Sequence, residues 1–123
     1  MKIHESGENY LESILTLKKK NGSVRAIDIV NDLGFSKPSV SVAMKNLRSN
    51  GYIEVSDEGY ITLTNQGLVI AEEVFERHAL MTRFLIHLGV DPEIAREDAC
   101  MMEHDISPES FKALKKHINS IIH

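Results

Sequence analysis

The sequence is poor in features that define several classes of protein. It has a single cysteine among 123 residues. One cysteine cannot form a disulfide within the chain, which excludes a disulfide-held secreted scaffold and a zinc finger of the Cys₄ or Cys₂His₂ type. No apolar run is long enough to span a membrane, and the first residues lack the apolar core of a signal peptide. We therefore expect a cytoplasmic protein without a membrane partner.

The chain also lacks an excess of basic residues, since its net charge is −4. This total looks unsuited to binding nucleic acid, but the charge is unevenly distributed. Residues 1–66 contain eight basic and eight acidic residues, whereas residues 67–123 contain six basic and ten acidic ones. Residues 18–25 carry four positive charges and residues 37–50 carry three, with no acid in either stretch. Local basic faces are therefore available for DNA.

The apolar periodicity predicts a mainly helical chain: three helices, a hairpin of two short strands and three more helices. Ser36, Asp91 and Ser107 are predicted N-caps, each with a proline in the following first turn, where a missing N–H costs nothing. We expect a winged helix-turn-helix domain over residues 1–66 and a helical domain over residues 67–123. The expected helices cover about residues 5–21, 24–33, 37–50, 64–88 and 92–105 and the stretch from 108 onward, and the expected strands cover 52–55 and 60–63.

A helix, a short turn with glycine, a second helix and a hairpin are typical of the winged helix-turn-helix, which places its second helix in the major groove of DNA. That helix needs small or polar side chains at its start to reach base edges, and cations further along to hold phosphates. A solvated helix face in a bundle is the alternative. Serine hydroxyls read bases permissively, while Pro38 and Val42 offer apolar surface to thymine methyl groups. The expected DNA-contacting residues are Arg25, Ser36, Lys37, Pro38, Ser39, Ser41, Val42, Lys45 and Arg48.

The only cysteine belongs to a second group of chemically active residues. Cys100, Glu103 and His104 are spaced i, i+3 and i+4, which places them on one face of a helix. A thiolate, a carboxylate and an imidazole are ligands of divalent transition metals. On spacing alone, a buried cysteine beside a surface glutamate and histidine is an open alternative.

Stretches along nearly the whole chain share the pattern of one known family. They are 7–12, 36–41, 51–53, 61–64 with Gly67, 77–78, 84–85, 88–90, 98–100 and 103–104. Together they resemble the diphtheria-toxin-repressor (DtxR/MntR) family of metal-dependent bacterial repressors. The resemblance implies a winged helix-turn-helix followed by a helical metal-binding and dimerisation domain.

The resemblance also implies a ligand set. The core metal site of the family matches Cys100, Glu103 and His104, and further ligands of its manganese branch match Glu12 and His78. Asn9 falls where the manganese branch has aspartate and the iron branch has methionine. An amide offers only an oxygen dipole, so Asn9 is the weakest member of the set, and Glu8, one residue earlier, is the alternative to it.

Other departures set the expected metal. Cysteine at position 100 resembles the iron branch, whereas the manganese branch has glutamate there. Two ancillary ligands of the iron branch fall on Thr82 and Arg96, which cannot serve, and we expect the short form that lacks the C-terminal SH3-like barrel. A thiolate favours softer ions than a carboxylate does. We therefore expect Fe(II) ahead of Mn(II), with Co(II), Ni(II) or Zn(II) as surrogates.

These inferences lead to one expected function and two alternatives. The resemblance implies a homodimeric repressor that binds a palindromic operator in double-stranded DNA when loaded with metal, and that controls genes of metal-ion homeostasis. The first alternative is a metal-independent winged-helix regulator in which Cys100 senses oxidants or is merely buried. The second is an enzyme. We expect no enzyme, because the sequence has no glycine-rich oxyanion loop and no separate base beside the cysteine.

Overall fold

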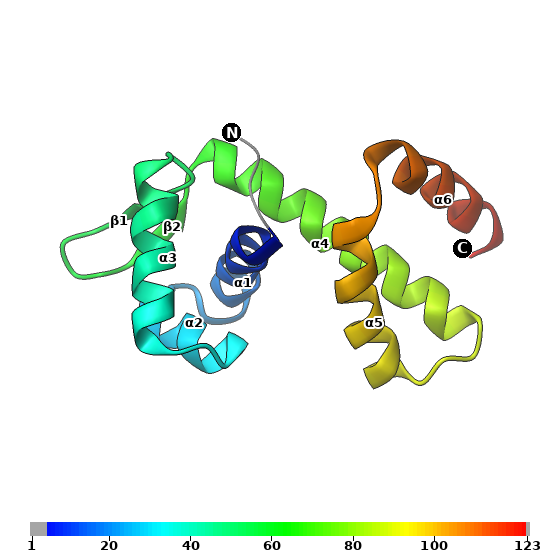
Figure 1. The fold of residues 1–123 in the computed structure, drawn as a ribbon, viewed down its shortest axis with the longest axis horizontal. Helices are drawn as coiled ribbons and strands as arrows, with labels where there is room; N and C mark the ends of the chain where they lie inside the picture. Colours follow the sequence, from blue (N-terminus) through cyan, green and yellow to red (C-terminus); the bar gives the residue numbers. More distant parts are fainter. Residues whose placement is uncertain (1–4, 123) are drawn as a thin grey trace. The chain divides into compact units, whose positions relative to one another are not determined.

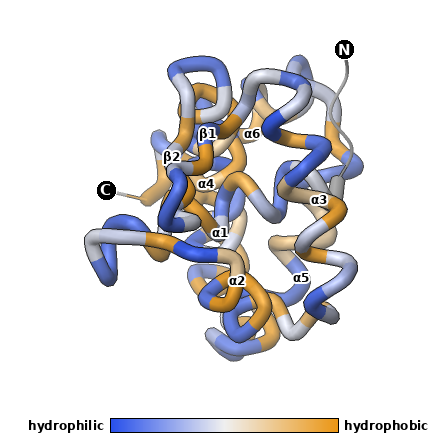
Figure 2. Tube along the Cα trace, turned by 90° about the vertical axis from the view of Figure 1, so that its left-hand side faces the viewer, coloured by the Kyte–Doolittle hydropathy of each residue, from blue (hydrophilic) through white to orange (hydrophobic). Residues whose placement is uncertain are grey.

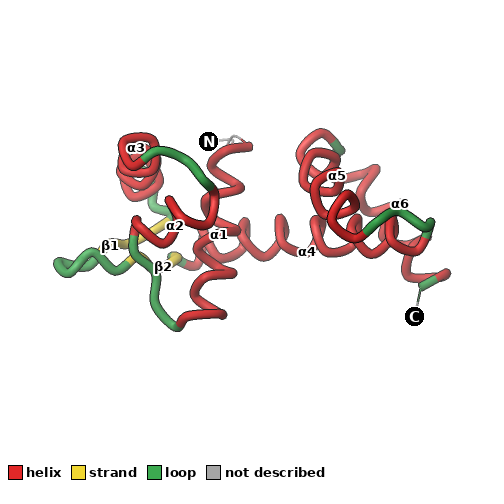
Figure 3. Tube along the Cα trace, turned by 90° about the horizontal axis from the view of Figure 1, so that it is seen from below, coloured by secondary structure: helices red, strands yellow, loops and turns green. Residues whose placement is uncertain are grey.

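The computed structural model describes residues 5–122. Over this range it contains three helices, an antiparallel hairpin and three further helices, which confirms the predicted order and the mainly helical class (Figure 1). Figure 3 shows how little of the tube is strand. The helices are α1 (Glu5–Asn21), α2 (Ala26–Leu33), α3 (Lys37–Ser49), α4 (Asn65–His87), α5 (Pro92–Asp105) and α6 (Pro108–Ile121), and the strands are β1 (Ile53–Val55) and β2 (Ile61–Leu63).

Three helices begin where their predicted N-caps stand. The hydroxyl oxygen of Ser36 accepts the backbone N–H of Ser39 at 3.2 Å, which starts α3. Asp91 and Ser107 cap α5 and α6 in the same way. A proline stands in the first turn of each of these helices. The local sequence therefore determines where α3, α5 and α6 begin.

α2 begins at Ala26, two residues later than the sequence predicted. Val24 is buried, and its carbonyl oxygen accepts the N–H of Ile61 at 2.8 Å, so Val24 pairs with strand β2 instead of joining the helix. The N–H of Arg25 donates to the carboxylate of Asp28 at 2.9 Å, which caps the helix at this point. The long-range bond to β2 outweighs the helical periodicity of the segment.

The hairpin is one residue shorter at the start of each strand than predicted. Tyr52 ends the preceding helix instead, because its N–H donates to the carbonyl of Leu47 at 3.0 Å. Tyr60 closes the turn: its carbonyl accepts the N–H of Ser56 at 2.9 Å. The paired positions then run from Ile53 opposite Leu63 to Val55 opposite Ile61.

The start of α4 is held against the hairpin. The hydroxyl of Thr64 donates to the carbonyl of Gly51 at 2.7 Å and accepts the N–H of Gly67 at 3.2 Å. A Cβ at position 67 would overlap the carbonyl oxygen of Tyr52. The close approach therefore requires glycine at position 67.

The chain forms two compact units, residues 1–73 and 74–123, and the division falls within α4. The core of the first unit draws on α1, α2, α3 and both strands, with Leu11, Ile29 and Val40 completely buried. The rings of Tyr10 and Phe35 meet edge to face at 5.7 Å beside this core. Figure 2 shows apolar and polar residues alternating along the tube, as expected of amphipathic elements that each bury one face.

The second unit comprises the later part of α4 with α5 and α6. Its buried residues include Val74, Met81, Ala95, Ala99 and Ile118. An ion pair between Lys115 and Glu76 joins α6 to α4. Among the described residues, no helix combines the length and apolar character needed to cross a bilayer.

Candidate metal centre and DNA-reading face

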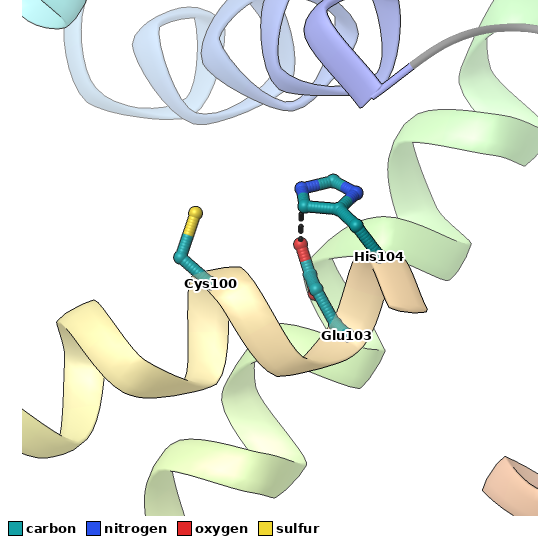
Figure 4. A group of neighbouring side chains, drawn as sticks. All are labelled: Cys100, Glu103 and His104. Carbon is teal, nitrogen blue, oxygen red and sulfur yellow. Dashed lines mark ion pairs between the residues drawn. The ribbon is translucent and has the colours of Figure 1, made fainter. Parts of the chain in front are cut away.

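Cys100, Glu103 and His104 converge on one side of α5 (Figure 4). One ligand atom of each residue lies within 4.8 Å of the others. The Nε2 atom of His104 is 3.3 Å from Oε1 of Glu103. Ligands of one transition-metal ion, at bond lengths of about 2.0–2.3 Å, lie about 3–4.5 Å apart. Small side-chain rotations are therefore enough to place these three residues on a single ion.

Burial makes this cluster unusual for a surface helix. The side chain of Glu103 is completely buried and that of His104 is 2% exposed, while Cys100 is partly exposed. Glu103 continues the buried stripe of Ala95 and Ala99 at four-residue intervals. A buried carboxylate is costly unless it is paired or coordinates a metal. The buried position and the sulfur, oxygen and nitrogen donors together fit a divalent transition metal.

His78 lies on α4, and its ring orientation suits a ligand. Its Nε2 atom is 3.1 Å from the backbone carbonyl oxygen of Arg96 on α5. A carbonyl only accepts, so Nε2 carries a proton, and in the neutral ring Nδ1 is then the atom with the lone pair. Histidine ligands commonly donate their second ring N–H to such a carbonyl, which fixes the tautomer and the ring. The close group among the described residues contains Cys100, Glu103 and His104 but not His78.

Asn9 and Glu12 lie on α1 in the first unit, and both are partly buried. Their i, i+3 spacing places them on one face of that helix. Next to Glu12, the buried hydroxyl of Ser13 donates to the carboxylate of Asp32 at 2.7 Å and so ties this part of α1 to α2. The role of Asn9 and Glu12 as ligands stays a prediction from the family resemblance.

α3 has two distinct faces. Val40, Met44 and Leu47 are buried, in agreement with the inward face that the sequence predicts. The predicted DNA-contacting residues of this helix are exposed. The hydroxyl of Ser36 also donates to that of Ser39 at 2.8 Å, so both serines take part in the helix cap. The exposed residues are Lys37, Pro38, Ser39, Ser41, Val42, Lys45 and Arg48.

A hollow of about 550 Å³ runs along the second half of α3 beside β1. Lys45 and Arg48 supply two cations to it, and Ser41 and Ser49 supply hydroxyls. The hydroxyl of Ser49 donates a hydrogen bond to the backbone carbonyl of Lys45 at 2.9 Å. Cations and hydroxyls beside a concave surface are the groups that hold a DNA phosphate backbone.

Arg25 is held beside the hairpin, at the start of α2. Its guanidinium carbon lies 4.4 Å from the centre of the Tyr60 ring, in a cation–π contact. Tyr60 is 42% exposed, so the contact orients Arg25 without burying it. Sequence reasoning selected Arg25 but missed Tyr60, whose only signal was an aromatic residue beside the predicted turn.

Two family models match the chain end to end. One, described as the N-terminal DNA binding domain of iron dependent repressors, covers residues 2–61. The other, described as the iron dependent repressor metal binding and dimerisation domain, covers residues 64–122. Their boundary lies close to the end of the hairpin.

Proteins with similar sequences are named as transcriptional regulators. The transcriptional regulator MntR of Escherichia coli O157:H7 is 40% identical over 108 residues, which are 88% of this chain and 70% of that protein. The HTH-type transcriptional regulator MntR of Listeria monocytogenes serotype 4b (strain F2365) is 32% identical over 106 residues, 86% of this chain and 75% of that protein.

Solved structures agree with these relatives. The manganese regulator SloR superposes with a TM-score of 0.81 at 26% identity, covering 97% of this chain and 55% of that one. ScaR with bound Zn²⁺ gives a TM-score of 0.76 at 26% identity, covering 92% of this chain and 53% of that one. The chain thus spans about half the length of these solved regulators.

Proposed function

Because this chain belongs to the iron-dependent repressor family, we propose that it is a metal-dependent transcriptional repressor that binds operator DNA as a homodimer. The observation that carries the proposal is the presence, in one chain, of an acid-free reading helix and a Cys100–Glu103–His104 cluster whose carboxylate is completely buried. The first supplies the contacts to DNA, and the second supplies the site through which a metal controls them.

The proposed ligands are Cys100, Glu103 and His104, joined by His78 and Glu12, with Asn9 as a weaker member. A bound divalent ion supplies positive charge beside the Glu103 carboxylate and lets Cys100 remain a thiolate. Within the chain itself, the backbone carbonyl of Arg96 holds the ring of His78 in one orientation. The Ala95–Ala99 stripe keeps α5 close to its neighbours, so Glu103 stays buried.

The proposed metal is Fe(II) or Mn(II). The names of MntR and SloR associate relatives with manganese, whereas the thiolate of Cys100 favours softer ions than a carboxylate would. Replacement Cys100→Glu, which introduces the residue expected in the manganese branch, should shift the order of affinities toward Mn²⁺ and away from Co²⁺ and Zn²⁺. Competition titrations of the two proteins measure this order directly.

Metal binding and DNA binding are proposed to be coupled. A ligand changes an equilibrium only by its different affinity for the two states, so metal must bind the DNA-competent state more tightly. The coupling is reciprocal, and operator DNA should tighten metal binding by the same factor. Equal DNA affinity with and without metal would contradict the proposal.

The homodimer is proposed to form through the second unit. Ile94 and Met101 are exposed on the side of α5 away from Ala95 and Ala99, and Met102 is exposed as well. Leu88, at the end of α4, is 62% exposed. A two-fold dimer presents two reading helices to a palindromic operator with half-sites about one helical turn apart. Sedimentation at micromolar concentration should therefore give twice the monomer mass.

The first experiment is an anaerobic Co²⁺ titration followed by absorption spectroscopy. Wild type should give a thiolate-to-cobalt charge-transfer band, and Cys100→Ser should lose it. His87→Gln, which alters an exposed histidine at the end of α4, is the matched control and should keep the band. No band and no metal retained after dialysis would overturn the metal site and favour the alternative, a winged-helix regulator whose Cys100 senses oxidants or is structural.

A further inference from the structure

Val42 is a solvent-exposed aliphatic residue in the middle of the DNA-reading face of α3. Its side chain is 60% exposed, more than any other large apolar residue among the described positions of the first unit. It lies on the opposite side of α3 from Val40, Met44 and Leu47, so no part of the core needs it. An isolated exposed valine is unremarkable on most surfaces, but this one stands where the proposed function places base edges.

The residues around Val42 leave room for close approach to DNA. Pro38 is one turn before it on the same face, and Ser39 and Ser41 flank it. These side chains are short, so the helix backbone can lie deep in a groove. Lys37 is the first residue of the helix and lies about 140° around it from Val42, off the centre of the face.

The first two turns of α3 contain few side chains that read purines by paired hydrogen bonds. Arginine or lysine reads guanine, while asparagine and glutamine read adenine. Of these, residues 37–44 contain only Lys37, which lies off the centre of the face. The exposed Asn46 lies in the later part of the helix, after these residues. What the reading half of the helix offers, besides small hydroxyls, is the apolar surface of Val42 and Pro38. In the major groove, the thymine C5-methyl group is the one apolar feature that distinguishes a base.

We propose that Val42 recognises a thymine methyl group in each operator half-site, with Pro38 beside it. This inference rests on the proposed function and adds the kind of sequence that the repressor selects. The hollow along α3 supports the orientation: Lys45 and Arg48 line it in the second half of the helix, where they hold the phosphate backbone. Phosphate contacts of this kind set the register of a helix on the duplex, and base contacts such as that of Val42 specify the sequence.

The expected size of the effect follows from burying one methyl group. Such burial changes an equilibrium constant by about fourfold. Replacing one thymine by deoxyuridine removes that methyl group and keeps every hydrogen-bonding group of the base. The loss of affinity at the contacted thymine should therefore be about fourfold, and it should disappear in a protein that lacks the valine side chain.

The test begins by selecting duplexes from a random-sequence pool with the full chain in the presence of Mn²⁺. The selected duplex is then made with deoxyuridine at one thymine at a time, and its affinity is measured at fixed salt concentration. We expect one sensitive thymine per half-site for the wild type and no sensitivity at that position for Val42→Ala. Val69→Ala, which alters a 56% exposed valine on α4, is the matched control and should keep the sensitivity.

The outcomes separate this inference from the proposed function. Metal-dependent selection of duplexes in which no thymine is sensitive to deoxyuridine would overturn the inference alone. A sensitivity that persists in Val42→Ala would do the same, because another residue would then read the methyl group. No metal-dependent selection with any of Mn²⁺, Fe²⁺ or Co²⁺ would overturn the proposed function, and the inference would fall with it.

Discussion

Replacing the buried carboxylate of Glu103 by an amide separates metal binding from folding. Glu103→Gln keeps the volume of a completely buried side chain and removes its charge. In the metal-free protein, the desolvation cost of that charge and its pairing with His104 disappear together. The amide oxygen of glutamine can still accept a hydrogen bond from the His104 ring, while the desolvation cost of a buried carboxylate, on the order of several kcal/mol, is removed. The metal-free variant should therefore be at least as stable as the wild type.

Added metal should raise the stability of the wild type much more than that of the Glu103→Gln variant. At a free metal concentration of 100 times Kd, binding stabilises the wild type by about 2.7 kcal/mol. An unfolding entropy of about 2.1 cal/mol/K per residue converts this to a rise in Tm of about 10 °C for 123 residues. Glu103→Gln should lose most of this rise, because one of three close ligands has become a poor donor.

The assay is thermal unfolding with and without Co²⁺, at one protein concentration because the protein is proposed to be a dimer. Asp105→Asn is the matched control, since it removes the same charge from an exposed position of α5 and should keep the metal-induced rise. A variant that loses several kcal/mol of stability without metal, yet keeps the full rise in Tm, would refute the reasoning. Glu103 would then be a structural residue and not a ligand.

Four further predictions follow from the first unit. Gly67→Ala should lower the free energy of unfolding by about 1–3 kcal/mol in urea titrations, because the added Cβ meets the carbonyl oxygen of Tyr52; an unchanged midpoint would contradict that contact. Ser36→Ala should cost about 1 kcal/mol through loss of the α3 cap, measured in the same way. Lys45→Ala should reduce the slope of log affinity for DNA against log salt by about 1 per subunit, which is about 2 for the proposed dimer, and an unchanged slope would place Lys45 away from phosphates. Burial raises the pKa of Tyr10, so its contribution to stability should be present below about pH 10, where the unfolded phenol begins to ionise, and be lost as the pH rises through the folded value; Tyr10→Phe should remove this part of the alkaline loss.

The elements that local chemistry determines could be predicted well. Ser36, Asp91 and Ser107 mark helix starts because a cap involves only residues a few positions apart. The inward face of α3 follows from the 3.6-residue period alone. Val24 was assigned wrongly to α2, since its partner, Ile61, lies 37 positions further along and no local pattern announces that bond.

In the candidate site, too, the features set by local spacing could be predicted and those set by tertiary packing could not. The convergence of Cys100, Glu103 and His104 is a matter of helical spacing and could be read from the sequence. The complete burial of Glu103 could not, because it depends on how α5 packs, although the i, i+4, i+8 row of Ala95, Ala99 and Glu103 was a signal. Asn9 and Glu12 come only from the family resemblance, since they stand some 90 residues before the cluster and no spacing links them to it.

The hydrogen bond from the N–H of Ile61 to the carbonyl of Val24 also affects how readily the hairpin opens and exchanges its amide hydrogens. Two strands of three residues are too short to be stable alone. Strand β2 is, however, hydrogen-bonded to the segment between α1 and α2. The amide of Ile61 should consequently exchange its hydrogen only when the helical core opens, whereas the turn at Asp57 and Glu58 exchanges freely. The hairpin is thus anchored to the helical domain at Ile61, and β2 should open there together with the segment between α1 and α2.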